Sequence, residues 1–286
     1  GGGSAMDCMK GANLLLTHGG RIQDYRGDAL PEALSRRSRL MPMIAVPTTA
    51  GTGSEAQSFA LISDPVTHEK MVCGDRRAPG AGGLRPVLAV LDPDLPRTVP
   101  RAVAAAVGID AIAHAVETAG CNARSAESLE FSVAAWRLLS RSFVQSLSDA
   151  EDEPARCDML VGAHLAGAAI ERSMLGAAHS CANPLTARFG VVHGRAVGLM
   201  LPHVVRFNAQ GHPSPYAALA ADAAGLAKQI ESFLQEAALP RRLRELNVPA
   251  EALPGLAREA AGQWTARFNP RPATVEMLLA LYQQAW

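Results

Sequence analysis

The sequence has no excess of charge of either sign, since 27 lysine and arginine residues balance 27 aspartate and glutamate residues over 286 positions. A neutral chain argues against nucleic acid or an anionic membrane surface as a partner bound through charge. We find no apolar run long enough to cross a bilayer, and therefore expect no membrane association. The five cysteines are scattered and contain no C-x-x-C pair. This pattern favours reduced thiols in a cytoplasmic protein.

The sequence contains two patterns, one typical of strands and one typical of helices, with a boundary near Pro100. Before it, short apolar runs predict strands at 41–46, 58–63, 70–73 and 87–91. Because the run at 41–46 is almost wholly apolar and ends at Pro47, we expect that strand to be buried. Two further predictions are a short helix before Arg39 and a surface loop at 76–85.

After Pro100 alanine and leucine are frequent, and the pattern is helical almost throughout. The predicted helices are 101–120, 126–148, 151–178, 193–207, 214–237, 239–245, 251–268 and 273–285. The sequence therefore predicts two domains: 1–98, with strands and helices, and 99–286, wholly helical.

Four residues of the helical part have the chemistry of metal ligands. Asp110 and His114 are four apart in a helical segment, so the carboxylate and the imidazole share a face. His179 and His193 are fourteen apart, about 21 Å on one straight helix, which is too far for one ion. Pro184 is expected to break the helix, as is Gly190, so a helix–turn–helix brings the two imidazoles together. One carboxylate and three imidazoles suit Zn²⁺ or Fe²⁺ and leave a position for water or substrate.

Two glycine-rich segments are suited to a phosphate-containing ligand, although neither has the G-x-G-x-x-G pattern. Gly1–Ser4 precedes a helix, so its backbone and the free N–H groups of the helix can approach a pyrophosphate. Thr48–Ser54 follows a strand, where ligands of open α/β sheets bind. The alternatives are a flexible Gly/Ser linker for the first segment and a plain turn for the second.

The chain resembles the iron-containing (group III, metal-dependent) alcohol dehydrogenases. The resemblance rests on Gly1–Lys10, Pro47–Glu55, Gly108–Glu117 and His179–Asn208, in that order and at similar separations, and more loosely on Phe268–Pro272. It implies a partial α/β nucleotide-binding domain followed by an all-α metal-binding domain, the architecture shared with dehydroquinate synthase. Catalysis would occur in the cleft between the two domains.

By the same resemblance, the function is hydride transfer between an alcohol or aldehyde and NAD or NADP at an Fe²⁺ or Zn²⁺ site. We expect a small-molecule substrate and a homodimer or larger homo-oligomer. The implied metal ligands are Asp110, His114, His179 and His193. The implied cofactor-binding residues are Gly2, Gly3, Ser4, Asp7, Thr48, Thr49, Thr52 and Lys70. No further catalytic side chain is assigned.

Two departures from the family pattern are visible. Asn183 stands where the family often has a histidine, which removes a titratable group. The chain also begins at Gly1, where relatives have earlier βα units, so we expect a fragment or a natural truncation. Two other functions stay open: an enzyme of the same fold group, such as a maleylacetate reductase or a metal-dependent lyase, and a catalytically inactive helical module.

Overall fold

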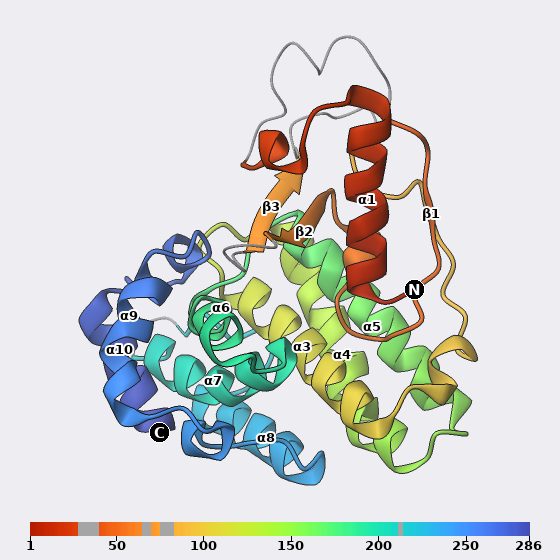
Figure 1. The fold of residues 1–286 in the computed structure, drawn as a ribbon. Helices are drawn as coiled ribbons and strands as arrows, with labels where there is room; N and C mark the ends of the chain where they lie inside the picture. Colours follow the sequence, from red (N-terminus) through yellow and green to blue (C-terminus); the bar gives the residue numbers. More distant parts are fainter. Residues whose placement is uncertain (28–39, 65–69, 75–82, 211–213) are drawn as a thin grey trace.

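The computed structural model describes residues 1–27, 40–64, 70–74, 83–210 and 214–286. The helix expected before Arg39 and most of the loop expected at 76–85 lie outside these residues. Figure 1 shows a small N-terminal part, in red and orange, standing on a larger body of yellow to blue helices. This arrangement confirms the expected fold class, a partial α/β domain followed by helices.

The N-terminal part contains one long helix, α1 (Gly3–His18), and short strands. The described strands are β1 (Ile44–Ala45), β2 (Phe59–Ser63), β3 (Lys70–Gly74) and β4 (Leu88–Ala89). β1 and β4 pair in parallel, whereas β2 and β3 pair in antiparallel fashion. A small separate core joins α1, β2 and β3, consisting of Leu14, Tyr25, Ala60, Met71, Cys73 and Leu84. All four predicted strands are therefore present.

The prediction that residues 41–46 are buried is wrong. Ile44 is 65% exposed, and Leu88 on the neighbouring strand is 52% exposed. An apolar groove of about 490 Å³ separates β1 from α1. An apolar run favours a strand, but burial depends on which other elements pack against it, and in the described residues β1 pairs only with β4.

The described residues after Pro100 form helices and turns without a strand. The helices are α3 (Arg101–Gly120), α4 (Ala126–Ser148), α5 (Glu153–Glu171), α6 (Ala177–Phe189), α7 (His193–Asn208), α8 (Ala223–Glu236), α9 (Leu253–Ala261) and α10 (Val275–Ala285). Several begin where the sequence supplies a capping side chain. Ser125, Asp152 and Asp222 each accept a backbone N–H of the first turn of the helix that follows.

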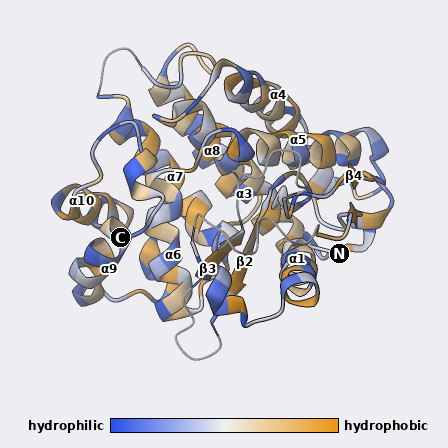
Figure 2. Cartoon of the chain, turned by 90° about the horizontal axis from the view of Figure 1, so that it is seen from above, coloured by the Kyte–Doolittle hydropathy of each residue, from blue (hydrophilic) through white to orange (hydrophobic). Residues whose placement is uncertain are grey.

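α3 is the central helix of this body. It contacts α4, α5 and α7, and Figure 2 shows it in the middle of the helices when the molecule is seen from above. Contrary to our expectation, α3 is long and apolar enough to cross a membrane, but 78% of its apolar window is buried inside the protein. Its composition is therefore that of a core helix.

The helices differ from the predictions in several places. The predicted helix 239–245 is only a short 3₁₀ turn at Leu243–Leu246, and the predicted helix 251–268 is interrupted, because α9 ends at Ala261 and a separate 3₁₀ turn covers Ala266–Phe268. The segment 151–178 is two helices, because α5 ends at Glu171 and α6 begins at Ala177. Residues 214–222 precede α8 as turns. Pro184 lies inside α6 without ending it. A proline removes one backbone donor, but Pro184 is itself buried between buried Ala182 and Leu185.

Candidate metal centre and cofactor site

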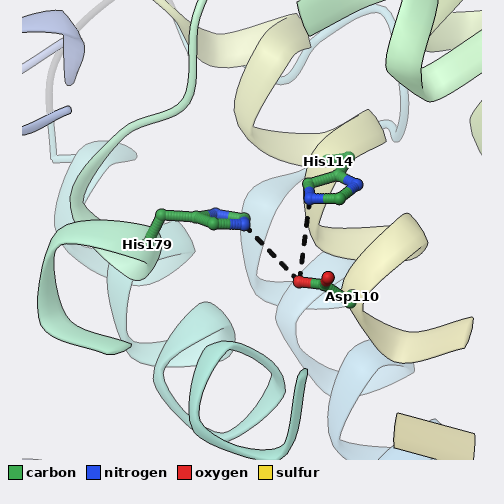
Figure 3. Close-up of side chains that lie close together, drawn as sticks. All are labelled: Asp110, His114 and His179. Carbon is green, nitrogen blue, oxygen red and sulfur yellow. Dashed lines mark ion pairs between the residues drawn. The ribbon is translucent and has the colours of Figure 1, made fainter. Parts of the chain in front are cut away.

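Four side chains from three helices meet where α3, α6 and α7 come together. Asp110 and His114 lie one turn apart on α3, as the spacing predicts. His179 is in the first turn of α6, and His193 is the first residue of α7. The imidazole Nε2 atoms lie 3.5 Å (His179), 3.7 Å (His114) and 4.0 Å (His193) from Asp110 Oδ1. Figure 3 shows the first two rings directed at this carboxylate.

The turn between α6 and α7 brings the last histidine into place. α6 ends at Gly190, which adopts a positive φ of 63°, and α7 begins three residues later. A Cβ on Gly194 would lie 1.9 Å from the carbonyl oxygen of Ala106 on α3. Because only a glycine allows this approach, the start of α7 can rest directly on α3, beside Asp110.

The residues present fit a divalent metal. Asp110, His114 and His179 are 4–6% exposed, while the His193 side chain is 24% exposed. Among the described residues, Asp110 Oδ1 and His179 Nε2 are buried polar atoms that have no hydrogen-bond partner. Such atoms are costly unless something satisfies them. A metal ion among the four groups would do so, and the more exposed His193 marks the side open to a substrate.

The pKa values of Asp110, His114 and His193 agree with this role. Burial would raise the pKa of Asp110, but the imidazoles around it outweigh burial, and its pKa lies below the usual range. Burial lowers the pKa of His114 and lowers that of His193 to about 3. Both rings are therefore neutral at physiological pH, the form that binds metal.

Glu117 is the functional residue that sequence reasoning missed. Its buried carboxylate accepts a short hydrogen bond from His179 Nδ1 and a 2.7 Å bond from the backbone N–H of Ala178. Together with the carboxylate of Asp110, it raises the pKa of His179 to about 9, against the opposing effect of burial. The signal was present, since Asp110, His114 and Glu117 follow the i, i+4, i+7 spacing of one helix face.

The two glycine-rich segments, far apart in sequence, lie side by side. The backbone N–H of Thr48 donates to the carbonyl of Gly1 at 3.1 Å. A Cβ on Gly3 would lie 2.5 Å from the Thr52 side chain, and one on Gly2 would lie 3.4 Å from Thr49. The first turn of α1 has no side-chain cap, so its N–H groups remain available to an anion. Ser4 is exposed on this turn.

Asp7 lies in the interior, beneath these segments. One carboxylate oxygen accepts from the Ser54 hydroxyl at 2.5 Å and the other from the Leu61 N–H at 3.1 Å. Next to it, Lys10 donates to the Ser54 carbonyl at 2.7 Å, and burial lowers the lysine pKa. These buried bonds attach the end of the segment Thr48–Ser54, the threonine-rich loop, to α1. Asp7 therefore stabilises the position of this loop by accepting the hydrogen bond of Ser54.

The Thr48–Ser54 loop also lies close to the four proposed metal ligands. Its Gly51 backbone lies close enough to His114 to oppose the fall in that imidazole's pKa. A Cβ on Gly53 would lie 2.6 Å from the Gly167 Cα on α5, which shows how closely loop and helix pack. Lys70 is exposed at the start of β3, and its charge contributes to the lowered pKa of His193.

A cavity of about 140 Å³ opens beside Thr49. Its walls come from the threonine-rich loop, from the residues before α3 and from α3, α4 and α5. Arg97, Arg101 and Arg156 contribute the positive charge in its lining.

Two other polar side chains of α6 have structural partners. Cys181 is completely buried, and burial raises its pKa, so it is a core thiol rather than a soft metal ligand. Asn183 donates from its side-chain amide to Gln263 at 3.0 Å.

Comparison with known proteins assigns the family. Residues 1–93 match the model described as iron-containing alcohol dehydrogenase, and residues 104–286 match the C-terminal model of the Fe-containing alcohol dehydrogenase family. Long-chain-alcohol dehydrogenase 1 of Geobacillus thermodenitrificans is 32% identical over 306 residues, covering 100% of this chain and 73% of that protein. NAD-dependent methanol dehydrogenase of Bacillus methanolicus is 29% identical, covering 100% and 75%.

Solved structures agree with this assignment. A crystal structure of 1,3-propanediol oxidoreductase matches with a TM-score of 0.90 and 30% identity, covering 100% of this chain and 75% of that one. A sulfoacetaldehyde reductase from Bifidobacterium kashiwanohense in complex with NAD⁺ matches with a TM-score of 0.87 and 27% identity, covering 99% and 74%. This chain belongs to the iron-containing alcohol dehydrogenase family.

Proposed function

We propose that this protein is a metal-dependent, NAD(P)-linked alcohol dehydrogenase that interconverts a small alcohol and its aldehyde. The observation that carries the proposal is the convergence of three imidazoles on the buried carboxylate of Asp110, at 3.5–4.0 Å, beside a loop that can hold a cofactor. When bound, the metal supplies Lewis-acid polarisation of the substrate oxygen, and the nicotinamide supplies the hydride chemistry. Asp110, His114, His179 and His193 are the proposed ligands, for Fe²⁺ or Zn²⁺.

The chain's own residues position the reactants. The uncapped first turn of α1, with Gly2, Gly3 and Ser4, is proposed to bind the pyrophosphate through backbone N–H groups. The hydroxyls of Thr48, Thr49 and Thr52 are proposed to bind phosphate or ribose oxygens. Asp7 contributes by fixing the loop through Ser54. Lys70 is proposed to lie near the nicotinamide end, since its charge reaches His193.

Proton release is proposed to run through water or a ribose hydroxyl. The position that often holds a histidine in the family is Asn183, whose amide is bonded to Gln263 and cannot titrate. The three imidazoles of the site are all proposed metal ligands, so none is left to act as a base. No further catalytic base is therefore assigned.

We further propose that residues 1–98 act as the cofactor domain and 99–286 as the metal domain. The separate small core of the first part and the helical core of the second support this division. A cytoplasmic location and a homo-oligomeric state of two or more copies complete the proposal. All five cysteines are free thiols, which suits a reducing compartment.

The experiment is metal analysis of the purified chain, followed by NADH and NADPH turnover with a panel of alcohols and aldehydes. We expect one equivalent of Fe²⁺ or Zn²⁺, and any turnover should be abolished by a chelator and restored by the metal. Asp110→Asn should lose both. Cofactor turnover that persists in metal-free protein would contradict the metal-dependent mechanism, and a chain that binds metal without turnover would leave only the inactive helical module.

A further inference from the structure

The start of α6 is held by side chains that come from far away in the sequence. Its N-cap residue, Gly176, supplies no side-chain cap. Instead, the N–H of Ala177 donates to Asn269 Oδ1 at 3.2 Å, and the N–H of Ala178 donates to Glu117 Oε1 at 2.7 Å. Since His179 is the next residue, these two bonds fix the backbone that carries it.

The other oxygen of the same carboxylate holds the ring of His179. Glu117 Oε2 accepts a short hydrogen bond from His179 Nδ1, so that both carboxylate oxygens are used within one turn of α6. When Nδ1 carries the proton, Nε2 keeps its lone pair. That Nε2 atom lies 3.5 Å from Asp110 Oδ1 and has no hydrogen-bond partner.

Among the described residues, the side-chain hydrogen bonds of Glu117 both go to α6. Glu117 is 4% exposed, and a buried carboxylate is tolerated only when it is hydrogen-bonded. A Cβ on Gly176 would lie 3.1 Å from Glu117 Oε1 and 3.1 Å from Asn269 Oδ1, so both acceptors lie close against the N-cap of α6. Asn269 is itself fixed, donating to Asn208 Oδ1 at 2.7 Å and to the Arg271 carbonyl at 2.8 Å.

We propose that Glu117 is a positioning residue for the metal centre: it selects the Nδ1–H tautomer of His179 and fixes the turn of α6 that presents Nε2 to the ion. This inference rests on the metal site of the proposed function. It assigns Asn269, in the Phe268–Pro272 segment, a lesser role as the second anchor of the same turn. Partners that orient a ligating histidine typically change metal affinity 10- to 100-fold when they are removed.

The test compares Glu117→Gln with Glu171→Gln. Glutamine keeps the volume of Glu117, but its amide offers one oxygen to two N–H donors, so either Ala178 or His179 Nδ1 loses its acceptor. Glu171 is a matched control, because it accepts the Ser58 N–H at 2.9 Å and the Ser58 hydroxyl at 2.5 Å but touches no proposed ligand. Asn269→Ala removes the other anchor of α6 and leaves the ring of His179 bonded.

Zn²⁺ affinity is measured by chelator competition, and the Co²⁺-substituted forms are compared by visible absorption. We expect Glu117→Gln to bind Zn²⁺ about 10- to 100-fold more weakly and to shift the Co²⁺ bands. Glu171→Gln should match the parent in both, and Asn269→Ala should lose less affinity than Glu117→Gln. Equal affinity and spectra for Glu117→Gln and the parent would overturn the inference, as would an equal loss in Asn269→Ala, which would reduce Glu117 to a helix anchor.

A measurement on the unmutated protein settles the matter even where a variant fails to fold. Long-range ¹H–¹⁵N correlation of the Zn²⁺-loaded protein should show the His179 proton on Nδ1 and the metal on Nε2. A metal on Nδ1 would refute the role of Glu117 while leaving the metal site intact. Absence of Zn²⁺ binding by the unmutated chain would instead overturn the metal site, and the inference with it.

Discussion

Gly194→Ala tests the packing that builds the metal centre. Its Cβ would be placed 1.9 Å from the Ala106 carbonyl, whereas real Cβ contacts stay beyond 3.0 Å. Both groups are backbone or rigidly attached to it, so the start of α7 must move away from α3 by about 1 Å. Overpacking of this kind costs about 1–3 kcal/mol of unfolding free energy.

The displacement has a second effect, on metal binding. His193 precedes Gly194 and moves with it, while ligand distances must hold to within about 0.2 Å. We therefore expect Zn²⁺ affinity to fall together with stability, measured by chelator competition and by urea unfolding of the metal-free protein. Gly262→Ala is the control, since its nearest neighbour is 3.5 Å away and its φ is ordinary. A Gly194→Ala variant that matches the parent in both measurements would refute the reasoning.

The other predictions concern the ligands and the loop. His193→Ala should sharply weaken metal binding by removing one of four ligands, and retention of metal through exhaustive dialysis would contradict the ligand set. Gly53→Val should lower the urea midpoint and weaken NADH binding measured by calorimetry, because the added Cβ meets Gly167 and the φ of Gly53 is 63°. An unchanged midpoint would count against this packing. In the metal-free protein the pKa of His179 is raised to about 9, so this ring must lose a proton to bind metal. Zn²⁺ affinity should therefore rise about tenfold per pH unit between pH 7 and 9 and then level, and a pH-independent Kd would contradict it. By the same linkage, metal-free stability gained from protonated His179 is present below pH 6.5 and lost as pH rises through about 9.

Local pattern predicted most of the helices. α3, α4, α7 and α10 were predicted nearly to the residue, because their apolar spacing and first-turn residues act within a few positions of the chain. The same locality explains the errors. Pro184 is a strong local signal against a helix, but α6 runs through it because buried neighbours on both sides hold the turn. Residues 151–178 have a helical composition, yet the chain turns at 172–176. Glu117 and Asn269 then accept hydrogen bonds from the first backbone N–H groups of α6.

The sequence by itself determined that Asp110 and His114 share a helix face, since their spacing equals one turn. It also limited His179 and His193 to separate helices. The resemblance to a family, rather than any local rule, joined the two pairs into one ligand set.

Only the tertiary structure decided that the four groups face one another, because this depends on how closely α7 approaches α3 at Gly194. It also decided that Asp7 and Glu117 are buried supports, and that the apolar strand at Ile44 is exposed. The physical reason is common to all three cases. Periodicity fixes which residues share a face of one element, whereas burial and convergence arise from contacts between residues tens of positions apart, which no local pattern contains.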